Sequence, residues 1–321
     1  MRLYRRGLMA APFALAAPAL AQEAFPSRPV SVVVPWGPGG PTDAFARVIG
    51  QRLSTDLGQP FVVDNRVGAN GTIGMGFAAR ARPDGHTLVI APNSTYAVAP
   101  HLYQLPYSHE RDFVGVGLLV SMPIFMLVRR DSPAATLAEY VALARQPNSR
   151  LTYANASVGA TSHLATEMLL QSAGIEVLEV NYRGGGPAVQ AVVAGEAGMV
   201  FMPAASVMGF IRSGELRALG VASAMRSPLA PDVPTFREQG FAEVEIVEHV
   251  AMLAPAGTPP AILERLNAAS RAALRAPDMQ PRLDALAVTP ETRPLAEWAE
   301  YAAAESARWG AVVRARNIRI P

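Results

Sequence analysis

The sequence of 321 residues contains neither cysteine nor lysine. Without cysteine the chain forms no disulfide, performs no thiol chemistry and offers no thiolate to a metal ion. Because all 28 basic residues are arginine, the chain also lacks the lysine of a Schiff-base enzyme and the phosphate-binding lysine of a P-loop. These absences exclude several common classes of enzyme.

Long hydrophobic runs are confined to the N-terminus. Arg2, Arg5 and Arg6 precede the apolar stretch 8–20, and a small-x-small pattern ends at Ala21. This arrangement predicts a secretory signal peptide that is cleaved after Ala21. Since no later apolar run reaches the roughly 18 residues of a membrane span, we expect a soluble protein of the periplasm.

Clustered positive charge is missing as well. Removal of the signal peptide takes three of the 28 basic residues and leaves 25, against 26 acidic residues. A nearly neutral chain gives no indication of nucleic-acid binding. No Gly-x-Ser-x-Gly motif occurs and the five histidines show no metal-ligand spacing, so we expect no metal, no cofactor and no hydrolase activity.

The chain does contain a regular alternation of strands and helices. It begins with a predicted strand 30–34, helix 43–57, strand 61–64, helix 73–81 and strand 87–90. Such a βαβαβ unit implies a parallel sheet that binds ligands at the carboxyl ends of its strands.

Two apolar segments, 114–120 and 124–128, follow before the alternation restarts. The elements expected after them are helix 137–145, strand 151–154, helix 161–173, strand 178–180, helix 188–194, strand 199–202, helix 206–211, strand 218–222, strand 244–254, helix 260–275 and helix 296–313. We therefore predict an α/β protein of two similar lobes, each a mostly parallel sheet flanked by helices, that are joined by crossover strands. Two such lobes would close like a hinged clamp around a ligand.

The predicted domain boundaries follow from the point at which the alternation of strands and helices begins again. The signal peptide takes residues 1–21, the first lobe takes 22–123 plus 248–321, and the second lobe takes 124–247. About 300 mature residues are also more typical of two domains than of one.

The first candidate binding loop lies between strand 30–34 and the following helix. Gly39 and Gly40 let the backbone approach a ligand closely, and Thr42 or Asp43 can cap the helix. Bare N–H groups and the positive helix end would hold an anion without a charged side chain. A plain capped turn is the alternative, but the position at the end of a sheet strand favours binding.

Two further candidate loops are rich in hydroxyl groups. Ser94 and Thr95 follow strand 87–90 and could donate to an anion, although they are also ordinary turn residues. Ser157, Thr161 and Ser162 surround a helix start, where hydroxyl and N–H groups converge well on a carboxylate. The alternative for these three is capping of the helix alone.

The fourth candidate loop combines Tyr182 with a flexible turn at Gly184 and Gly185. Tyr182 would supply an aromatic wall. Arg183, between them, could be a ligand clamp or a solvated surface charge.

These loops belong to a series of motifs that runs along the whole mature chain. In order they are Arg28-Pro29-Val30, Pro35 to Asp43, Leu57-Gly58-Gln59-Pro60, Val62-Val63-Asp64-Asn65-Arg66, Gly71-Thr72-Ile73-Gly74, Pro83-Asp84-Gly85-His86-Thr87-Leu88, Leu105-Pro106-Tyr107, Arg111-Asp112-Phe113, Tyr153-Ala154, Ser162-His163-Leu164, Tyr182-Arg183-Gly184-Gly185, Gly214-Glu215-Leu216-Arg217-Ala218-Leu219 and Ala254-Pro255-Ala256-Gly257-Thr258-Pro259. In this series the chain resembles the Bug-type extracytoplasmic solute receptors, the binding component of tripartite tricarboxylate transporters.

The resemblance implies a two-lobe periplasmic-binding-protein fold of type II that closes on a small organic acid, with no enzymatic activity. The implied partners are the membrane subunits of a tripartite transporter, and a monomer is expected. In such receptors the strand-end loops hold a ligand carboxylate through backbone groups, hydroxyls and bridging waters. The implied positions are Gly39, Gly40, Thr42 and Asp43 in one lobe, and Ser157, Gly159, Thr161 and Ser162 in the other.

The sequence departs from the family pattern in the predicted pocket wall. The family commonly has Asp at the positions of Gly198 and Met202, and it tends to have Trp and Gly at the positions of His249 and Ala251. Without the two acids no carboxylate is evident that would pair with an ammonium group, so we expect a ligand that carries none. The departures leave the ligand unnamed.

Two other functions are compatible with parts of this reading. A receptor that docks on a membrane signalling protein would have the same fold and pocket. An exported α/β enzyme is suggested by Gly37-x-Gly39-x-x-Thr42, which imitates a dinucleotide fingerprint with Asp64 at the end of the next strand, but the third glycine is missing.

Overall fold

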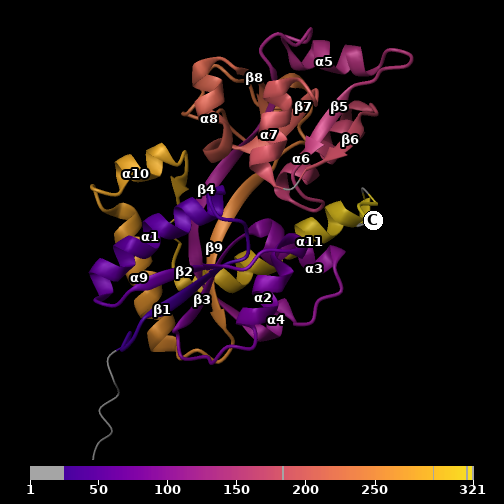
Figure 1. Cartoon of the computed structure of the whole chain (residues 1–321). Coiled ribbons are helices and arrows are strands. Elements are labelled where there is room, and N and C mark those ends of the chain that lie inside the picture. The colour runs from indigo at the N-terminus through magenta and orange to yellow at the C-terminus, as the bar shows by residue number, and fades with distance from the viewer. Residues whose placement is uncertain (1–24, 183, 292, 316, 320–321) are drawn as a thin grey trace, which may run out of the picture.

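The structure is a computed structural model that describes residues 25–182, 184–291, 293–315 and 317–319. The predicted signal peptide and its cleavage site lie outside these residues. Figure 1 shows two α/β bodies, one above the other, connected by the long strands β4 (Phe113–Arg129) and β9 (Val247–Pro255). We call the body around β1–β3 the first lobe and the body around β5–β7 the second lobe.

The sheet of the first lobe has the strand order β2-β1-β3-β9-β4. Its three parallel strands are β1 (Val30–Val34), β2 (Phe61–Asn65) and β3 (Thr87–Pro92), and β9 joins β3 antiparallel. One face packs against α1 (Pro41–Leu57), α9 (Pro260–Arg275) and α10 (Gln280–Ala285). The other face packs against α2 (Thr72–Ala78), α3 (Ala99–Leu102) and α11 (Trp298–Ala315), with α4 (His109–Asp112) just before β4.

The second lobe repeats the design around β5 (Thr152–Asn155), which is parallel to β6 (Leu178–Asn181) and β7 (Met199–Pro203). Strand β8 (Leu216–Val221) pairs antiparallel with β4. The helices are α5 (Leu137–Ala144), α6 (Thr161–Ala173), α7 (Gly185–Ala194) and α8 (Ala204–Ser213). Helices α5 and α6 cover one face of this sheet, and α7 and α8 cover the other.

The two apolar segments noted in the sequence, 114–120 and 124–128, both lie in one continuous strand, β4. The first part of β4 pairs with β9, and from Ile124 onward it pairs with β7 and β8. Pro123 lies where the partner changes. Because proline has no N–H to donate, it suits a position where one ladder ends and the next begins, and the backbone stays extended through it.

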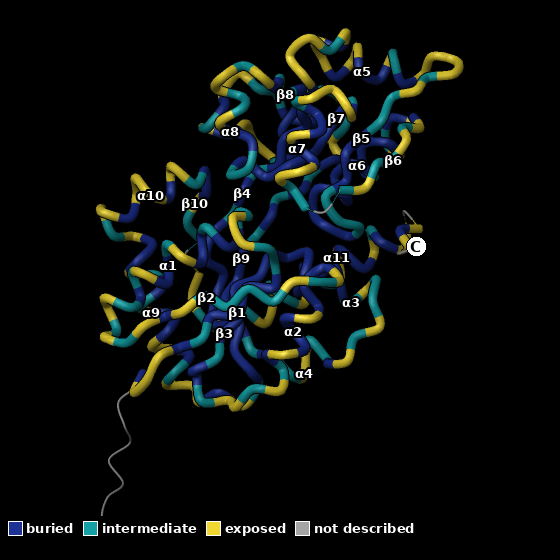
Figure 2. The backbone as a smooth tube through the Cα atoms, viewed as in Figure 1, coloured by how far each residue is buried: buried dark blue, intermediate teal, exposed yellow. Residues whose placement is uncertain are grey.

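Alternate residues of the central strands enter two different cores. Val32 and Val34 of β1 pack toward α1 and α9, whereas Val33 packs toward the opposite layer. Burial of both faces is expected for a parallel sheet covered by helices. Figure 2 shows the central strands β4 and β9 dark over most of their length and exposed residues on the outer turns of the helices.

Most predicted elements are found within a few residues of their expected ends. Ser94 and Thr95 differ, because they lie in a buried π-helical turn (Ser94–Val98) and not in an open loop. The structure also has the short elements α3, α4, α10 and β10 (Thr289–Pro290), which the sequence pattern did not indicate. Among the described helices, none combines the length and apolar character that crossing a membrane requires.

Candidate functional site

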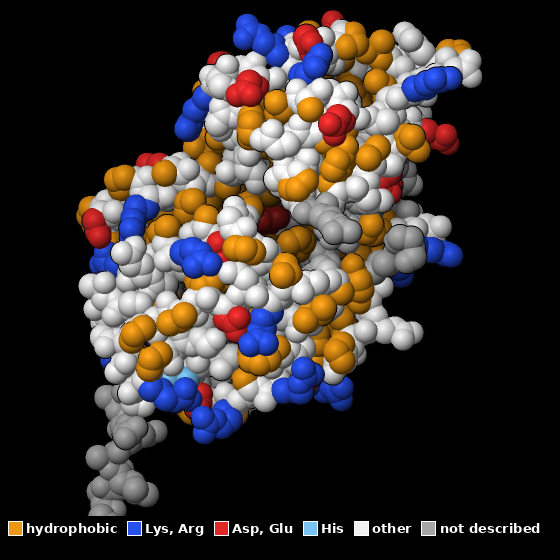
Figure 3. All heavy atoms as spheres, viewed as in Figure 1, with side chains coloured by type: hydrophobic (Ala, Val, Ile, Leu, Met, Phe, Trp, Pro, Cys, Tyr) orange, Lys and Arg blue, Asp and Glu red, His pale blue; other side chains and the backbone are white. Residues whose placement is uncertain are grey.

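A cavity of about 330 Å³ lies between the two lobes, at the carboxyl ends of their parallel strands. Figure 3 shows the hollow between the lobes from one side. Seven of the predicted binding residues line this cavity: Gly39, Gly40, Thr42, Ser94, Ser162, Gly184 and Gly185. The other lining residues are Trp36, Gly37, Pro38, Pro41, Pro92, Ala156, Ala160, Gly186, Pro187, Met202, Pro203 and Glu248.

The N-termini of three long helices meet at this cavity. Helices α1, α6 and α7 begin after the N-cap residues Gly40, Ala160 and Gly184, and none of these helices has a side-chain cap. Pro203, the N-cap residue of α8, lines the cavity as well. The first N–H groups of a helix have no partner within the helix, and together they form its positive end. Convergence of such ends makes an anion site from backbone alone.

The turn before α1 is held by Asp43. Its carboxylate accepts hydrogen bonds from the Gly39 N–H at 2.9 Å, from Arg47 at 3.0 Å and from Asn65 at 2.8 Å. Burial opposes ionisation of Asp43, but these bonds together keep its pKa below the usual value. Asp43 does not line the cavity, so its observed contacts are those of a residue that supports the turn.

The sequence predicted free backbone N–H groups at Gly39 and Gly40, but both groups already have hydrogen-bond partners within the turn. The Gly39 N–H donates to Asp43, and the Gly40 N–H donates to the Gly37 carbonyl at 3.3 Å. The N–H groups left by helix geometry to face an anion are those of Thr42 and Asp43 in the first turn of α1. Glycine is still required at position 39, where φ is +79°.

Two of the predicted residues lie at the contact between the lobes and not in the cavity lining. The Thr161 hydroxyl donates to Asn93 Oδ1 at 3.4 Å, and the Gly159 carbonyl accepts from Asn70 Nδ2 at 3.2 Å. Asn70 and Asn93 belong to the first lobe. Thr161 and Gly159 therefore bridge the lobes.

Three further predicted residues, Thr95, Ser157 and Tyr182, are not part of the cavity lining. The Thr95 hydroxyl accepts from Trp36 Nε1 at 2.9 Å and so fixes a ring that lines the cavity. Ser157 and Tyr182 are tied by their backbone N–H groups to the side chain and carbonyl of Asn155. Arg183 lies outside the described residues.

Sequence reasoning missed several lining residues, among them Trp36, Met202 and Glu248. Met202 was noted only for the acid it replaces, and the structure puts its side chain in the cavity wall, whereas Gly198 is not part of the lining. His249 is not part of the lining either, and its Nδ1 lies 4.0 Å from Glu305.

Glu248 corrects the expectation that no carboxylate faces the ligand. It lines the cavity although it is only 9% exposed. Burial raises the pKa of Glu248 to about 7, and the nearby Thr161 hydroxyl offsets only part of that increase. No signal in the sequence separated this glutamate from others on predicted strands.

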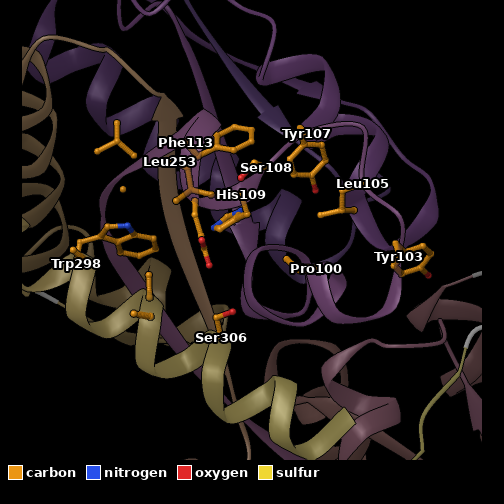
Figure 4. Close-up of a pocket in the computed structure, with 16 residues that line it drawn as sticks. Pro100, Tyr103, Leu105, Tyr107, Ser108, His109, Phe113, Leu253, Trp298 and Ser306 are labelled. Atoms are coloured by element: carbon orange, nitrogen blue, oxygen red, sulfur yellow. The ribbon is translucent and has the colours of Figure 1, made fainter. Parts of the chain in front are cut away.

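A second cavity, of about 580 Å³, lies in the first lobe beside α11 (Figure 4). Aromatic side chains dominate its wall, including Tyr107, Phe113 and Trp298. Its histidine, His109, is neutral at pH 7 because burial lowers its pKa to about 4. His109 therefore supplies no cation. The N-termini of α1, α6 and α7, which line the cavity between the lobes, are not part of this second cavity. Although larger, it is a poorer anion site.

Comparisons with known proteins agree with this geometry. The family model described as "Tripartite tricarboxylate transporter family receptor" matches residues 45–318. The protein BugT of Bordetella pertussis is 34% identical over 318 residues, which cover 98% of this chain and 97% of BugT. MatC from Rhodopseudomonas palustris, solved with bound malate, is 35% identical with a TM-score of 0.83, over 90% of this chain and 100% of that one.

A second solved R. palustris protein, Rpa4515 with adipate, has a TM-score of 0.87 at 31% identity, over 92% of this chain and 99% of the other. These likenesses confirm the two-lobe periplasmic-binding-protein fold. They also confirm the resemblance found in the sequence motifs, because the family model covers most of the chain. The chain belongs to the tripartite tricarboxylate transporter receptor family, whose members are periplasmic solute-binding proteins.

Proposed function

We propose that this receptor closes its two lobes on a small carboxylate-bearing metabolite and presents it to the membrane subunits of a tripartite transporter. The observation that supports this most is the convergence of the α1, α6 and α7 N-termini on one cavity between the lobes. A carboxylate is the anion that such a site suits in a small organic solute.

The expected affinity is consistent with this chemistry. Hydrogen bonds to a charged group contribute about 1.5–3 kcal/mol each. Three or four of them give useful affinity once the cost of association is met. The relatives MatC and Rpa4515 were solved with malate and adipate, which are both carboxylates. We extend that class, and not either compound, to this chain.

The delivery role determines where the protein acts. We propose that residues 1–21 direct export, that cleavage follows Ala21, and that the mature receptor works in the periplasm as a monomer. We also propose that the lobes divide at 123/124 and 247/248. Those positions lie in β4 and at the start of β9, the two strands that connect the lobes.

A thermal-shift screen of the mature chain tests the carboxylate class directly. The screen covers mono-, di- and tricarboxylates and aromatic acids, with the amide of each acid as its matched control and with NAD and sugars as other classes. Binding at a hundred times the dissociation constant stabilises the folded state by about 2.7 kcal/mol. For a chain of this size we expect a rise in Tm of roughly 4 °C with an acid and none with its amide.

Two results would contradict the proposal. One is a shift with only NAD or sugars. The other is loss of the rise in Tm with carboxylates in Tyr107→Phe. This conservative change alters the second cavity and leaves the cavity between the lobes untouched. Retention of the shift in that variant is the expected result, because the cavity between the lobes is unchanged in it.

A further inference from the structure

Glu248 is the one titratable side chain among the described residues that line the cavity between the lobes. All other lining groups are backbone, hydroxyl, thioether, proline, alanine or indole. The cavity therefore combines several positive helix ends with a single carboxyl group, which comes from β9. Among the described lining residues, that carboxyl is the only side chain that can carry a negative charge opposite a cation.

Glu248 also lacks a cationic partner within the part of the chain that the structure describes, where no arginine or histidine nitrogen comes within 4.0 Å of its carboxyl. The nearby Thr161 hydroxyl is its polar neighbour, and the hydroxyl of the buried Tyr96 is close enough to sense its charge. A buried carboxyl group without a counter-charge is costly to keep ionised.

A second buried glutamate, Glu305, has a fuller set of hydrogen-bond partners than Glu248. Glu305 accepts hydrogen bonds from Asn93 at 3.0 Å and from Trp309 at 2.7 Å, with His249 at 4.0 Å. Although burial opposes it, this set of partners lowers the pKa of Glu305 to about 2. Glu305 thus has a structural role that is complete without a ligand, and Glu248 does not.

We propose that Glu248 receives an ammonium group of the ligand, so that the receptor selects small amino-carboxylates. This inference rests on the proposed function, since the helix ends are taken to hold the carboxylate of the same molecule. The ammonium group would be the positive partner that the carboxylate of Glu248 lacks among the described residues. The direct attraction between two charges is stronger in a buried site than in water. The pair also removes the cost of an uncompensated buried charge.

Other ligand groups suit this position less well. When Glu248 is ionised, a second carboxylate beside it would repel it, and like charges in contact cost several kcal/mol. A ligand hydroxyl could donate a hydrogen bond but would leave the charge uncompensated. A ligand with one anionic and one cationic end therefore suits this cavity best. Its cationic end would meet Glu248, which lies outside the two family positions that lack their acid here.

Matched ligand pairs test the inference, each pair differing by one ammonium group. The probes are aspartate with succinate, alanine with propionate, and 4-aminobutyrate with butyrate, titrated calorimetrically at pH 8 into the mature wild-type chain. We expect the ammonium member of at least one pair to bind at least about tenfold more tightly than its partner. In Glu248→Gln that ratio should fall by about tenfold or more, with binding of the plain acid retained or improved.

Glu245→Gln is the matched control, because Glu245 is close in sequence but pairs with Arg237 away from the cavity. Its ratio should equal that of the wild type. If the wild type does not prefer the ammonium member of any pair, or if Glu248→Gln leaves the ratio unchanged, the inference fails while carboxylate binding stands. If no carboxylate of either kind binds, the proposed function itself fails.

Discussion

The cavity between the lobes has two unlike walls. One is made of helix starts, where Thr42, Ser162 and Gly185 stand in the first turns of α1, α6 and α7. The other is made of side chains, with Trp36 and Met202 as apolar surfaces and Glu248 as the single acid among the described lining residues. The backbone wall offers the same N–H groups whatever the side chains are. In the proposed function, the helix starts hold the carboxylate and the side-chain wall determines which carboxylate is accepted.

The largest effect should come from placing an acid in the helix-start wall. In Ser162→Asp, the new carboxylate lies at the start of α6, where the helix dipole favours it. It should occupy the anion site and repel the ligand, which lowers affinity for any carboxylate by on the order of a thousandfold. The free energy of unfolding should stay unchanged or rise slightly. Calorimetric titration and denaturant unfolding measure the two quantities.

Ser162→Asn separates charge from size in this experiment, because asparagine and aspartate have almost the same shape. The asparagine variant should lose only a small part of the affinity. Equal losses in both variants would mean that bulk, and not the positive helix ends, governs binding at this wall.

An intermediate effect is expected from the side-chain wall, in the stability of the protein without ligand. Burial raises the pKa of Glu248 to about 7, above the 4.5 of an ordinary glutamate. A raised carboxyl pKa stabilises the fold fully below the ordinary value, and this contribution is lost as the pH rises through the folded-state value. Between pH 5 and pH 8 the wild type should lose roughly 2.5 kcal/mol of unfolding free energy relative to Glu248→Gln.

The difference between the two proteins is the quantity to measure, by urea unfolding at several pH values. His109 titrates in the opposite sense, because burial lowers its pKa to about 4 and the folded state gains stability as the pH rises above that value. Its contribution is the same in both proteins and cancels. Parallel curves for the wild type and Glu248→Gln would show that the carboxyl ionises normally in the folded protein.

The contrast between the walls also explains what the sequence could predict. Helix starts after strands carry local signals, namely glycine for a turn and serine or threonine before an amphipathic run. Gly39, Ser162 and Gly185 were found in this way, and all three line the cavity. The order of strands and helices likewise depends on short-range periodicity and gave the two-lobe α/β architecture.

The side-chain wall depends on long-range pairing that no local signal contains. Alternation along β9 shows only that Glu248 and His249 point to opposite faces. Which face borders the cavity is decided by the pairing of β9 with β3 and β4, whose sequences lie more than a hundred residues away. The same limit applies to Thr161 and Ser162, which are neighbours on α6 but face the other lobe and the cavity respectively.

The smallest effect should distinguish these two neighbours. Ser162→Ala removes one hydroxyl from the cavity but leaves the N–H groups of α6 in place, so affinity for a carboxylate should fall only about two- to tenfold. Its unfolding free energy should not change. Thr161→Val removes the donor to Asn93 at the contact between the lobes and should lower the unfolding free energy by about 1 kcal/mol. A loss of affinity in Ser162→Ala as large as that in Ser162→Asp would mean that hydroxyls, and not helix ends, hold the anion. In that case the helix-start wall would not hold the carboxylate through its backbone N–H groups, and its role would not differ from that of the side-chain wall.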